Sequence, residues 1–245
     1  MRPPPLPHQI VVLERALERA SEADASTTPL VVFDLDGTLY DNRPRTVQIL
    51  AEYAEEVADQ FPEVAEALEA LTAEGVHYLL SDTLRAQGLT KVEIVSDATR
   101  FWRDRFFAEK YLKYDAVKDG AVEFARACHE LGATIVYLAG RDVTDLLPGT
   151  VTSLRKWGFP VGEIGVELVL KPDATLSDEA FKRASLPVLR RVGRVVAFFD
   201  NEPANCNVAR HVWPEAIVGL IETTSVPGAP DLDSGVDVIR DFRRV

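Results

Sequence analysis

Short apolar runs alternate with helical patterns over most of the chain. Runs typical of buried parallel strands occur at residues 30–33, 134–138, 167–170, 195–199 and 216–221. Apolar positions at helical spacing occur at residues 9–22, 142–157, 178–191 and 202–212. Because strands that alternate with helices form a parallel sheet covered on both faces, the pattern predicts an α/β fold with a doubly wound, mostly parallel sheet.

One block interrupts this alternation. From residue 43 to residue 131 the apolar positions recur almost entirely at helical spacing. We interpret the block as an all-helical cap domain inserted after the first strand, above the sheet edge where such folds bind their ligands. The predicted core domain then comprises residues 1–42 and 132–245. From about residue 223 the chain mixes Pro, Gly and Asp, and we expect a surface tail there.

Composition narrows the class of partner. The net charge of −12 and the pI near 4.9 argue against a nucleic-acid partner, which requires a basic surface. No apolar run approaches the roughly 20 residues of a membrane helix, and the first residues lack the apolar stretch of a signal peptide. We therefore expect a cytoplasmic protein with no membrane partner. The sequence does not indicate an oligomeric state, and its two cysteines and four histidines form no metal-ligand pattern.

The candidate chemistry begins directly after the first apolar run. Asp34 and Asp36 follow a buried strand, and two carboxylates placed so close together raise at least one pKa. A divalent cation would relieve their repulsion, and the pair supplies both a nucleophile and a neighbouring acid/base. Gly37 permits a tight turn, whose backbone amides could hold a phosphoryl group.

The string VVFDLDGTL at residues 31–39 resembles the first signature of the haloacid dehalogenase superfamily, hhhDxDGTL. The resemblance implies a Rossmann-like core and a phosphatase in which Asp34 attacks phosphorus and forms an aspartyl-phosphate. Asp36 would protonate the leaving group and then activate water, and Leu35 would contribute its backbone to phosphate binding. The resemblance also implies Mg²⁺ as cofactor, held by Asp34, Asp36 and Asp200.

A second site is expected where the run at 134–138 ends. The segment YLAGRD resembles the family's YLTGRD form, but Ala139 stands where a phosphate-binding hydroxyl is expected. Loss of that hydrogen bond, worth about 1.5–3 kcal/mol, would slow the reaction by about one to two orders of magnitude. The amide of Gly140 can still donate, and Arg141 could supply charge to the substrate or remain a surface cation at a helix start.

A lysine and an acidic residue complete the expected set. Lys171 closes a strand in the KP form of many relatives, whereas Lys182 lies 18 residues before Asp200, a spacing similar to that in polynucleotide kinase phosphatase domains. We favour Lys182 as the catalytic lysine and keep Lys171 as a phosphate-binding alternative. The resemblance makes Asp200 the side-chain metal ligand. Asn201 replaces the second aspartate of many relatives, and Glu202 could compensate for the lost charge.

Three functions remain open at this stage. The leading hypothesis is Mg²⁺-dependent hydrolysis of a small phosphorylated metabolite. Ala139 and Asn201 give weight to an alternative, a catalytically weak or inactive binding or regulatory protein with the same fold. A second alternative is a nucleotide or polynucleotide-end phosphatase, against which the acidic chain argues. Carbon–halogen hydrolysis is not expected. The branch of the superfamily that it resembles lacks the second aspartate, which is present in this chain as Asp36.

Overall fold

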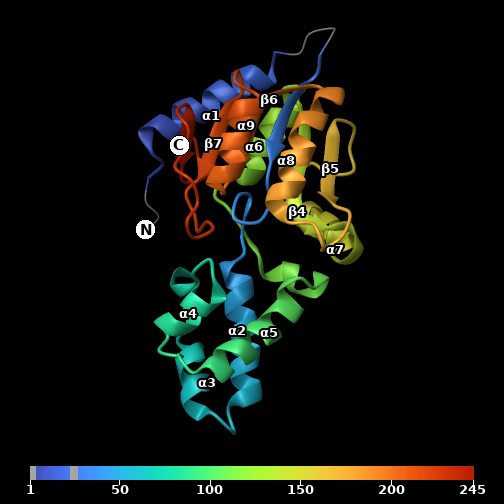
Figure 1. The fold of residues 1–245 in the computed structure, drawn as a ribbon. Coiled ribbons are helices and arrows are strands. Elements are labelled where there is room, and N and C mark those ends of the chain that lie inside the picture. The colour runs from blue at the N-terminus through green and yellow to red at the C-terminus, as the bar shows by residue number, and fades with distance from the viewer. Residues whose placement is uncertain (1–3, 23–26) are drawn as a thin grey trace.

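The computed structural model describes residues 4–22 and 27–245 and contains an α/β domain joined to a helical lobe (Figure 1). In the described residues, six strands form one sheet in the order β5-β4-β1-β6-β7-β8, and every neighbouring pair is parallel. The strands are β1 (Pro29–Phe33), β4 (Thr134–Asp142), β5 (Val166–Lys171), β6 (Arg194–Asp200), β7 (Ile217–Ile221) and β8 (Val236–Ile239). The predicted doubly wound parallel sheet is confirmed.

Helices cover both faces of this sheet. One face carries α1 (Pro7–Ala20), α6 (Ala121–Glu130) and α7 (Val143–Trp157), and the other carries α8 (Asp178–Val188) and α9 (Pro203–Val212) (Figure 1). Side chains of β1 alternate between the two apolar layers, with Val31 and Phe33 in the first and Leu30 and Val32 in the second. Since both faces are buried, β1 is apolar throughout, as its sequence predicts.

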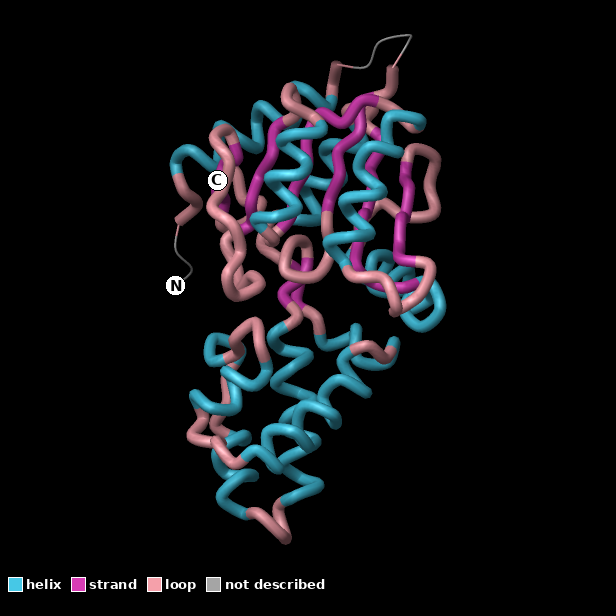
Figure 2. The backbone as a smooth tube through the Cα atoms, viewed as in Figure 1, coloured by secondary structure: helices cyan, strands magenta, loops and turns pink. Residues whose placement is uncertain are grey.

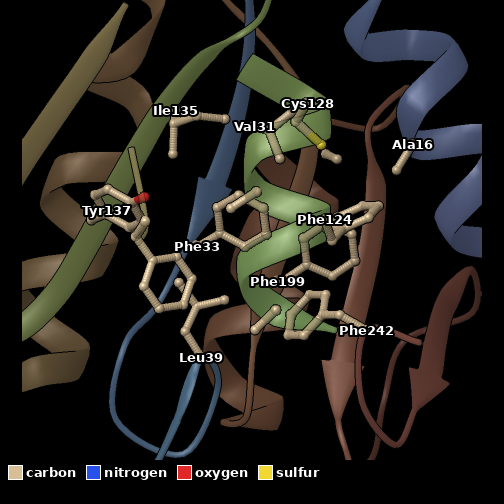
Figure 3. Close-up of a cluster of buried hydrophobic side chains, with 14 of the residues drawn as sticks. Ala16, Val31, Phe33, Leu39, Phe124, Cys128, Ile135, Tyr137, Phe199 and Phe242 are labelled. Atoms are coloured by element: carbon tan, nitrogen blue, oxygen red, sulfur yellow. The ribbon is translucent and has the colours of Figure 1, made fainter. Parts of the chain in front are cut away.

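Aromatic rings fill the first of these layers. Phe33 stacks on Phe199 with ring centroids 5.4 Å apart, and Phe124 and Phe242 pack edge-on against this pair and stack on each other (Figure 3). Offset and edge-to-face rings at such distances add to the stabilisation that burial of their apolar surface provides. This packing fixes the end of β1, which directly precedes Asp34, and the end of β6, which is Asp200.

The inserted lobe has an apolar core of its own. It consists of α2 (Arg43–Val57), α3 (Pro62–Glu69), α4 (Leu80–Ala86) and α5 (Val92–Phe106), with short 3₁₀ turns at Ala73–Gly75 and Glu109–Tyr114. A two-stranded antiparallel ribbon, β2 (Tyr40–Asp41) and β3 (Ala116–Val117), connects it to the sheet domain (Figure 2). We call this lobe the cap. None of the helices in the described residues combines the length and apolarity needed to cross a membrane.

The end of the cap differs from the expected boundary at residue 131. Helix α6, expected in the cap, packs on the sheet, and Phe124, Ala125 and Cys128 lie in the same apolar layer as β1. Its helical periodicity shows that it has a buried face but not which domain that face contacts. The cap's apolar cluster instead extends only to Tyr111 and the neighbouring Tyr114.

The prediction of a surface tail after residue 223 was wrong. Strand β8 pairs in parallel with β7, and Phe242 is 1% exposed in the core. Gly120 makes this packing possible, because a Cβ there would lie 2.5 Å from the Phe242 backbone. The run VDVI is short and contains a charge, as edge strands often do, so its pattern was hidden among turn residues.

Candidate active site

A cavity of about 680 Å³ lies between the cap and the carboxyl edge of the sheet. Asp34, Asp36, Arg141 and Lys182 line it from the core, and residues of α2, α5 and the segment before α4 line it from the cap. Cavities of this size hold small molecules, and the carboxyl ends of parallel strands are where α/β folds bind them. All four core residues are candidates that the sequence indicated.

The turn after β1 is fixed by contacts that require its glycine. The Asp34 amide donates to the Phe199 carbonyl at 2.9 Å, and the Gly37 amide donates to the Tyr40 carbonyl at 2.7 Å. Gly37 has φ +85°, and a Cβ there would lie 2.6 Å from the side chain of Asn201. Only glycine tolerates both the backbone angle and this close approach. The turn therefore holds Asp34 and Asp36 in one orientation beside β6.

Lys182 connects two of the predicted site residues. Its ammonium donates to Asp34 Oδ1 at 2.6 Å and to Asp200 Oδ2 at 2.7 Å, and all three side chains are buried. Burial opposes the charge on this lysine, but the carboxylates of Asp200 and Asp34 outweigh it and raise the pKa of Lys182. Three side chains from separate elements, the β1 turn, α8 and β6, therefore meet at one point.

Lys171 lies apart from this group. Its ammonium donates to Asp178 Oδ1 at 2.7 Å, and the Asp178 side chain is mostly exposed. Asp178 also approaches Gly140 so closely that a Cβ there would overlap the Asp178 carboxylate. Gly140 and Asp178 line the rim of the cavity. The structure thus places Lys182 beside Asp34, while Lys171 pairs with an acidic side chain at the rim.

Asp34 has one oxygen that nothing in the described residues satisfies. Its Oδ2 is buried without a hydrogen-bond partner, while Oδ1 accepts from Lys182. Burial raises the pKa of Asp34 to about 7, with Lys182 lowering it and Asp200 raising it further. A buried, unpartnered carboxylate oxygen is costly, so this atom is suited to a cation or a phosphorus atom. The donor set fits Mg²⁺, a hard cation that prefers carboxylate oxygen.

The three predicted metal ligands are not equivalent. Asp200 accepts from the Glu202 amide at 2.8 Å and from the Asn205 side chain at 3.2 Å, which orients its carboxylate beside Asp34. The Asp36 carboxylate points to arginines instead, and no group of three or more Asp, Glu, His or Cys side chains in the described chain is arranged as a metal site. Two side chains are therefore available for a metal, and from Asp36 only its backbone carbonyl.

Asp36 is held by two arginines. Arg141 donates to its Oδ2 and Oδ1 at 2.7 and 2.9 Å, and Arg45 donates to Oδ1 at 2.8 Å. Both arginines also donate to Asp115, at 2.6 Å from Arg45 and 3.2 Å from Arg141. Burial alone would raise the pKa of Asp36, but Arg141 and Arg45 outweigh it and hold this pKa below its usual value. Arg141 thus contacts Asp36, where the sequence suggested a substrate contact or a surface cation.

Sequence reasoning missed Arg45 and gave Asp115 no role. Arg45 is in the first turn of α2 and Asp115 directly precedes β3, so both lie at the ends of the cap near the connecting ribbon. They are 1% exposed and lie 70 positions apart in the sequence. Their position beside the cap boundaries is the signal that could have found them.

The remaining predicted positions are mostly structural. The side chain of Leu35 is fully buried, so only its backbone is available to a ligand, and its carbonyl accepts from the Tyr40 amide at 2.9 Å. Ala139 lies inside β4, which continues to Asp142 beyond its predicted end. Asn201 donates to the Thr224 carbonyl at 3.0 Å. Glu202 lines the cavity, and burial raises its pKa to about 7.

Comparison with known proteins shows which of them share this fold. Residues 28–147 match the family model of haloacid dehalogenase-like hydrolases. A Clostridium difficile protein that carries the name of a phosphatase is 17% identical with a TM-score of 0.55, covering 82% of this chain and 88% of its own. A hydrolase of the same superfamily from Geobacter sulfurreducens, subfamily IA variant 1, is 12% identical with a TM-score of 0.55, covering 90% and 96%.

A third similar structure carries the name of a different activity. Protein tyrosine kinase A of Mycobacterium tuberculosis is 18% identical with a TM-score of 0.53, covering 87% of this chain and 94% of that one. A search of curated proteins returned no match. At these identities the structural likeness establishes the fold, and the chemistry has to be argued from the site.

Proposed function

We propose that this chain, which belongs to the haloacid dehalogenase superfamily, is a Mg²⁺-dependent phosphohydrolase that acts on small phosphorylated metabolites. The observation that carries the proposal is the geometry of Asp34. One oxygen of this buried carboxylate is oriented by Lys182, and the other is unpartnered in a cavity lined by cationic and acidic groups. Such a carboxylate is an oriented nucleophile for which the protein provides no competing donor.

The reaction proceeds in two displacements at phosphorus. Asp34 attacks the phosphate monoester, the bond from phosphorus to the ester oxygen breaks, and an aspartyl-phosphate forms as the alcohol leaves. Water then attacks the phosphorus, which releases inorganic phosphate and restores the Asp34 carboxylate. Lys182 neutralises part of the charge that Asp34, Asp200 and the phosphoryl oxygens bring together, which lowers the electrostatic barrier to anionic attack.

The side chains of Asp34 and Asp200 and the backbone carbonyl of Asp36 would hold Mg²⁺. When bound, the ion supplies positive charge to the phosphoryl oxygens. The amides of Glu202 and Asn205 orient the Asp200 carboxylate for this role.

Asp36 is the proposed acid/base, and its arginines set a condition on that role. Before Asp36 can protonate the leaving oxygen, its carboxylate must release at least one arginine and contact the substrate instead. Arg141 belongs to the core strand β4, whereas Arg45 belongs to the cap helix α2. A displacement of the cap would therefore remove Arg45 from Asp36 and leave Arg141 in place.

A second candidate function is a phosphate-binding or regulatory protein with little turnover. The contacts of Arg141 and Arg45 with Asp36 favour this second function, because the two arginines stabilise the carboxylate and oppose its protonation. The absence of a hydroxyl at Ala139 acts in the same direction. Both candidates require phosphate binding beside Asp34, and they differ in whether inorganic phosphate is released.

The test is phosphate release from a broad panel of phosphate monoesters. We expect release that requires Mg²⁺, stops with a chelator and is lost in Asp34→Asn. The matched control is Asp82→Asn, a half-buried carboxylate on the cap that does not line the cavity, and it should keep full activity. If no member of the panel releases phosphate at high protein concentration, the enzyme proposal fails and the binding function remains.

A further inference from the structure

The cap side of the cavity carries a cluster of aromatic rings. Trp102, Phe106 and Phe107 lie at the end of α5, with ring centroids 4.5 Å apart for Trp102 and Phe106 and 5.2 Å apart for Phe106 and Phe107. The indole N–H of Trp102 donates to Thr46 Oγ1 at 3.1 Å. Its polar atom is thus satisfied within the cap, and the three rings present apolar surface to the cavity. We call these three residues the aromatic cluster.

This cluster lies one side chain away from the reacting groups. The guanidinium carbon of Arg45 is 4.2 Å from the centroid of the Phe106 ring, and its Nη1 donates to the Phe106 carbonyl at 2.9 Å. The same guanidinium donates to Asp36 at 2.8 Å. A phosphate monoester with its phosphorus at Asp34 would share the cavity with the aromatic cluster, which offers apolar surface to its alcohol part.

Another apolar surface lines the cavity from the segment before α4. Val76, Tyr78 and Leu79 contribute to it, together with Leu80, the first residue of α4. Tyr78 is 45% exposed, Leu79 43% and Phe107 52%, although all three are large apolar or aromatic side chains. Exposed apolar side chains gathered in one cavity mark a binding surface for a ligand with apolar parts.

The charges of the cavity are already paired. Four arginine or lysine side chains of the described residues line it, and each contacts a carboxylate of the chain, as Arg45, Arg141 and Lys182 do. The fourth, Arg43, donates to Asp41 at 2.6 Å. Three further acidic side chains, Asp178, Glu179 and Glu202, also line the cavity. A second anionic group on a ligand would meet this acidic lining without an unpaired arginine or lysine among the described lining residues.

We propose that the cavity selects phosphate monoesters of uncharged, ring-bearing alcohols and discriminates against a second anionic group. The inference rests on the proposed function and narrows its substrate. The rings of the aromatic cluster would bury a ring of the alcohol part, and a further carboxylate or phosphate would lie beside the carboxylates of Asp178 and Glu202 without an arginine or lysine to pair with. Discrimination by an unpaired buried charge is stronger than discrimination by shape.

A matched pair of substrates isolates the charge. The two are 4-carbamoylphenyl phosphate and 4-carboxyphenyl phosphate, which have nearly the same shape and differ by one negative charge. We expect kcat/KM to be at least about tenfold higher for the carbamoyl compound, because an unpaired charge in a cavity commonly costs more than 1.4 kcal/mol. Naphthyl phosphate should likewise exceed glycerol phosphate. Equal values within either pair would overturn the proposal.

Variants of exposed lining residues connect the preference to the proposed surface. Phe107→Ala and Tyr78→Ala should lower kcat/KM for naphthyl phosphate by a larger factor than for glycerol phosphate. The matched control is Val92→Ala, an exposed apolar residue at the other end of α5, which should change neither. Leu79→Arg adds a cation to the lining and should reduce the difference between the carbamoyl and carboxy compounds. An unchanged difference in that variant would contradict the proposed charge selection.

Binding to Asp34→Asn separates this inference from the proposed function. Titration calorimetry of this variant with both compounds of the matched pair requires no turnover. Tighter binding of the uncharged compound without hydrolysis by the wild type would support the inference and reject the enzyme proposal. Hydrolysis of both compounds with equal affinity and equal kcat/KM would support the enzyme and reject the inference. A nucleoside monophosphate in the same series shows whether a nucleoside or a simpler aromatic alcohol supplies the ring.

Discussion

Arg45 and Asp36 form a hydrogen bond of 2.8 Å between the cap and the core. Arg45 is almost fully buried and also donates to Asp115, which directly precedes the strand that returns the chain to the core. The proposed acid/base, the first helix of the cap and the end of the cap are therefore joined by one guanidinium. A change in the position of the cap would change the environment of Asp36 directly.

The pair of Arg45 and Asp115 should be strongly coupled in stability. Arg45→Met leaves Asp115 buried with only the longer contact from Arg141, and we expect a loss of about 3 kcal/mol in the free energy of unfolding. Asp115→Leu alone should also destabilise, but the double variant should lose less than the sum of the two. Urea denaturation of the wild type, the two single variants and the double variant measures this coupling. Strictly additive losses of unfolding free energy would mean that the two side chains do not interact.

Lys182 and Lys171 should differ sharply in their effect on catalysis. Lys182→Met removes the cation between Asp34 and Asp200, and we expect kcat to fall by about 10²–10³, as when a charge-stabilising donor is lost. Lys171→Met removes a partner of the exposed Asp178, and kcat should stay within about threefold because such pairs contribute little. Steady-state kinetics with circular dichroism of both variants tests this. A comparable fall of kcat in both variants would mean that Lys182 has been assigned incorrectly as the catalytic lysine.

Asp34 should make the metal-free protein less stable as the pH rises. Its pKa is about 7 in the folded state against an ordinary value of 3.8, so between these values the folded protein binds more protons than the unfolded one. Unfolding free energy therefore declines across that range through this group. Asp34→Asn does not titrate, so the wild type should lose stability relative to it between about pH 4 and about pH 7. Denaturation of both proteins in the presence of a chelator measures the difference in their unfolding free energies at each pH. A difference that stays constant with pH would refute the raised pKa of Asp34.

The C-terminal segment should be a stabilising part of the core. Asp241 accepts from Gln9 Nε2 of α1 at 2.8 Å and from Arg243, so it ties the end of the chain to the first helix. Burial tends to raise its pKa, but hydrogen bonds from Arg243 and Gln9 outweigh this and lower it. Asp241→Asn should cost about 1–2 kcal/mol at neutral pH.

The pH dependence of that loss provides the check. A depressed pKa contributes stability above the ordinary aspartate value, near 4, and this contribution disappears as the pH falls below it. The difference between the wild type and Asp241→Asn should therefore shrink in acid. The exposed Asp231→Asn serves as control and should be neutral throughout. A loss that is as large in acid as at pH 7 would mean that the carboxylate charge is not involved.

The sequence predicted the features that local patterns encode. The apolar run and DLDGT turn located β1, Asp34 and Gly37, and an equally clear run located Asp200 at the end of β6. Spacing alone left Lys171 and Lys182 as alternatives, because the choice depends on how α8 packs on the sheet. Only the packed structure places Lys182 between the two carboxylates.

Long-range relationships were beyond the reach of these patterns. Arg45 and Asp115 meet across 70 positions, and neither belongs to a motif. Strand β8 has four residues with a charge among them, so its place in the sheet depends on pairing with β7 rather than on its own apolar pattern. The face of α6 contacts β1 rather than the cap for the same reason, since periodicity does not identify a helix's partner.

The covalent intermediate on Asp34 tests the central claim most directly. The protein is mixed with a hydrolysed phosphate monoester and Mg²⁺, quenched in acid within the first turnover, and its peptides are analysed by mass spectrometry. The account predicts one added phosphoryl group on the peptide that contains Asp34, absent in Asp34→Asn and absent with chelator. Phosphate release without this adduct, or with equal rate in Asp34→Asn, would contradict it.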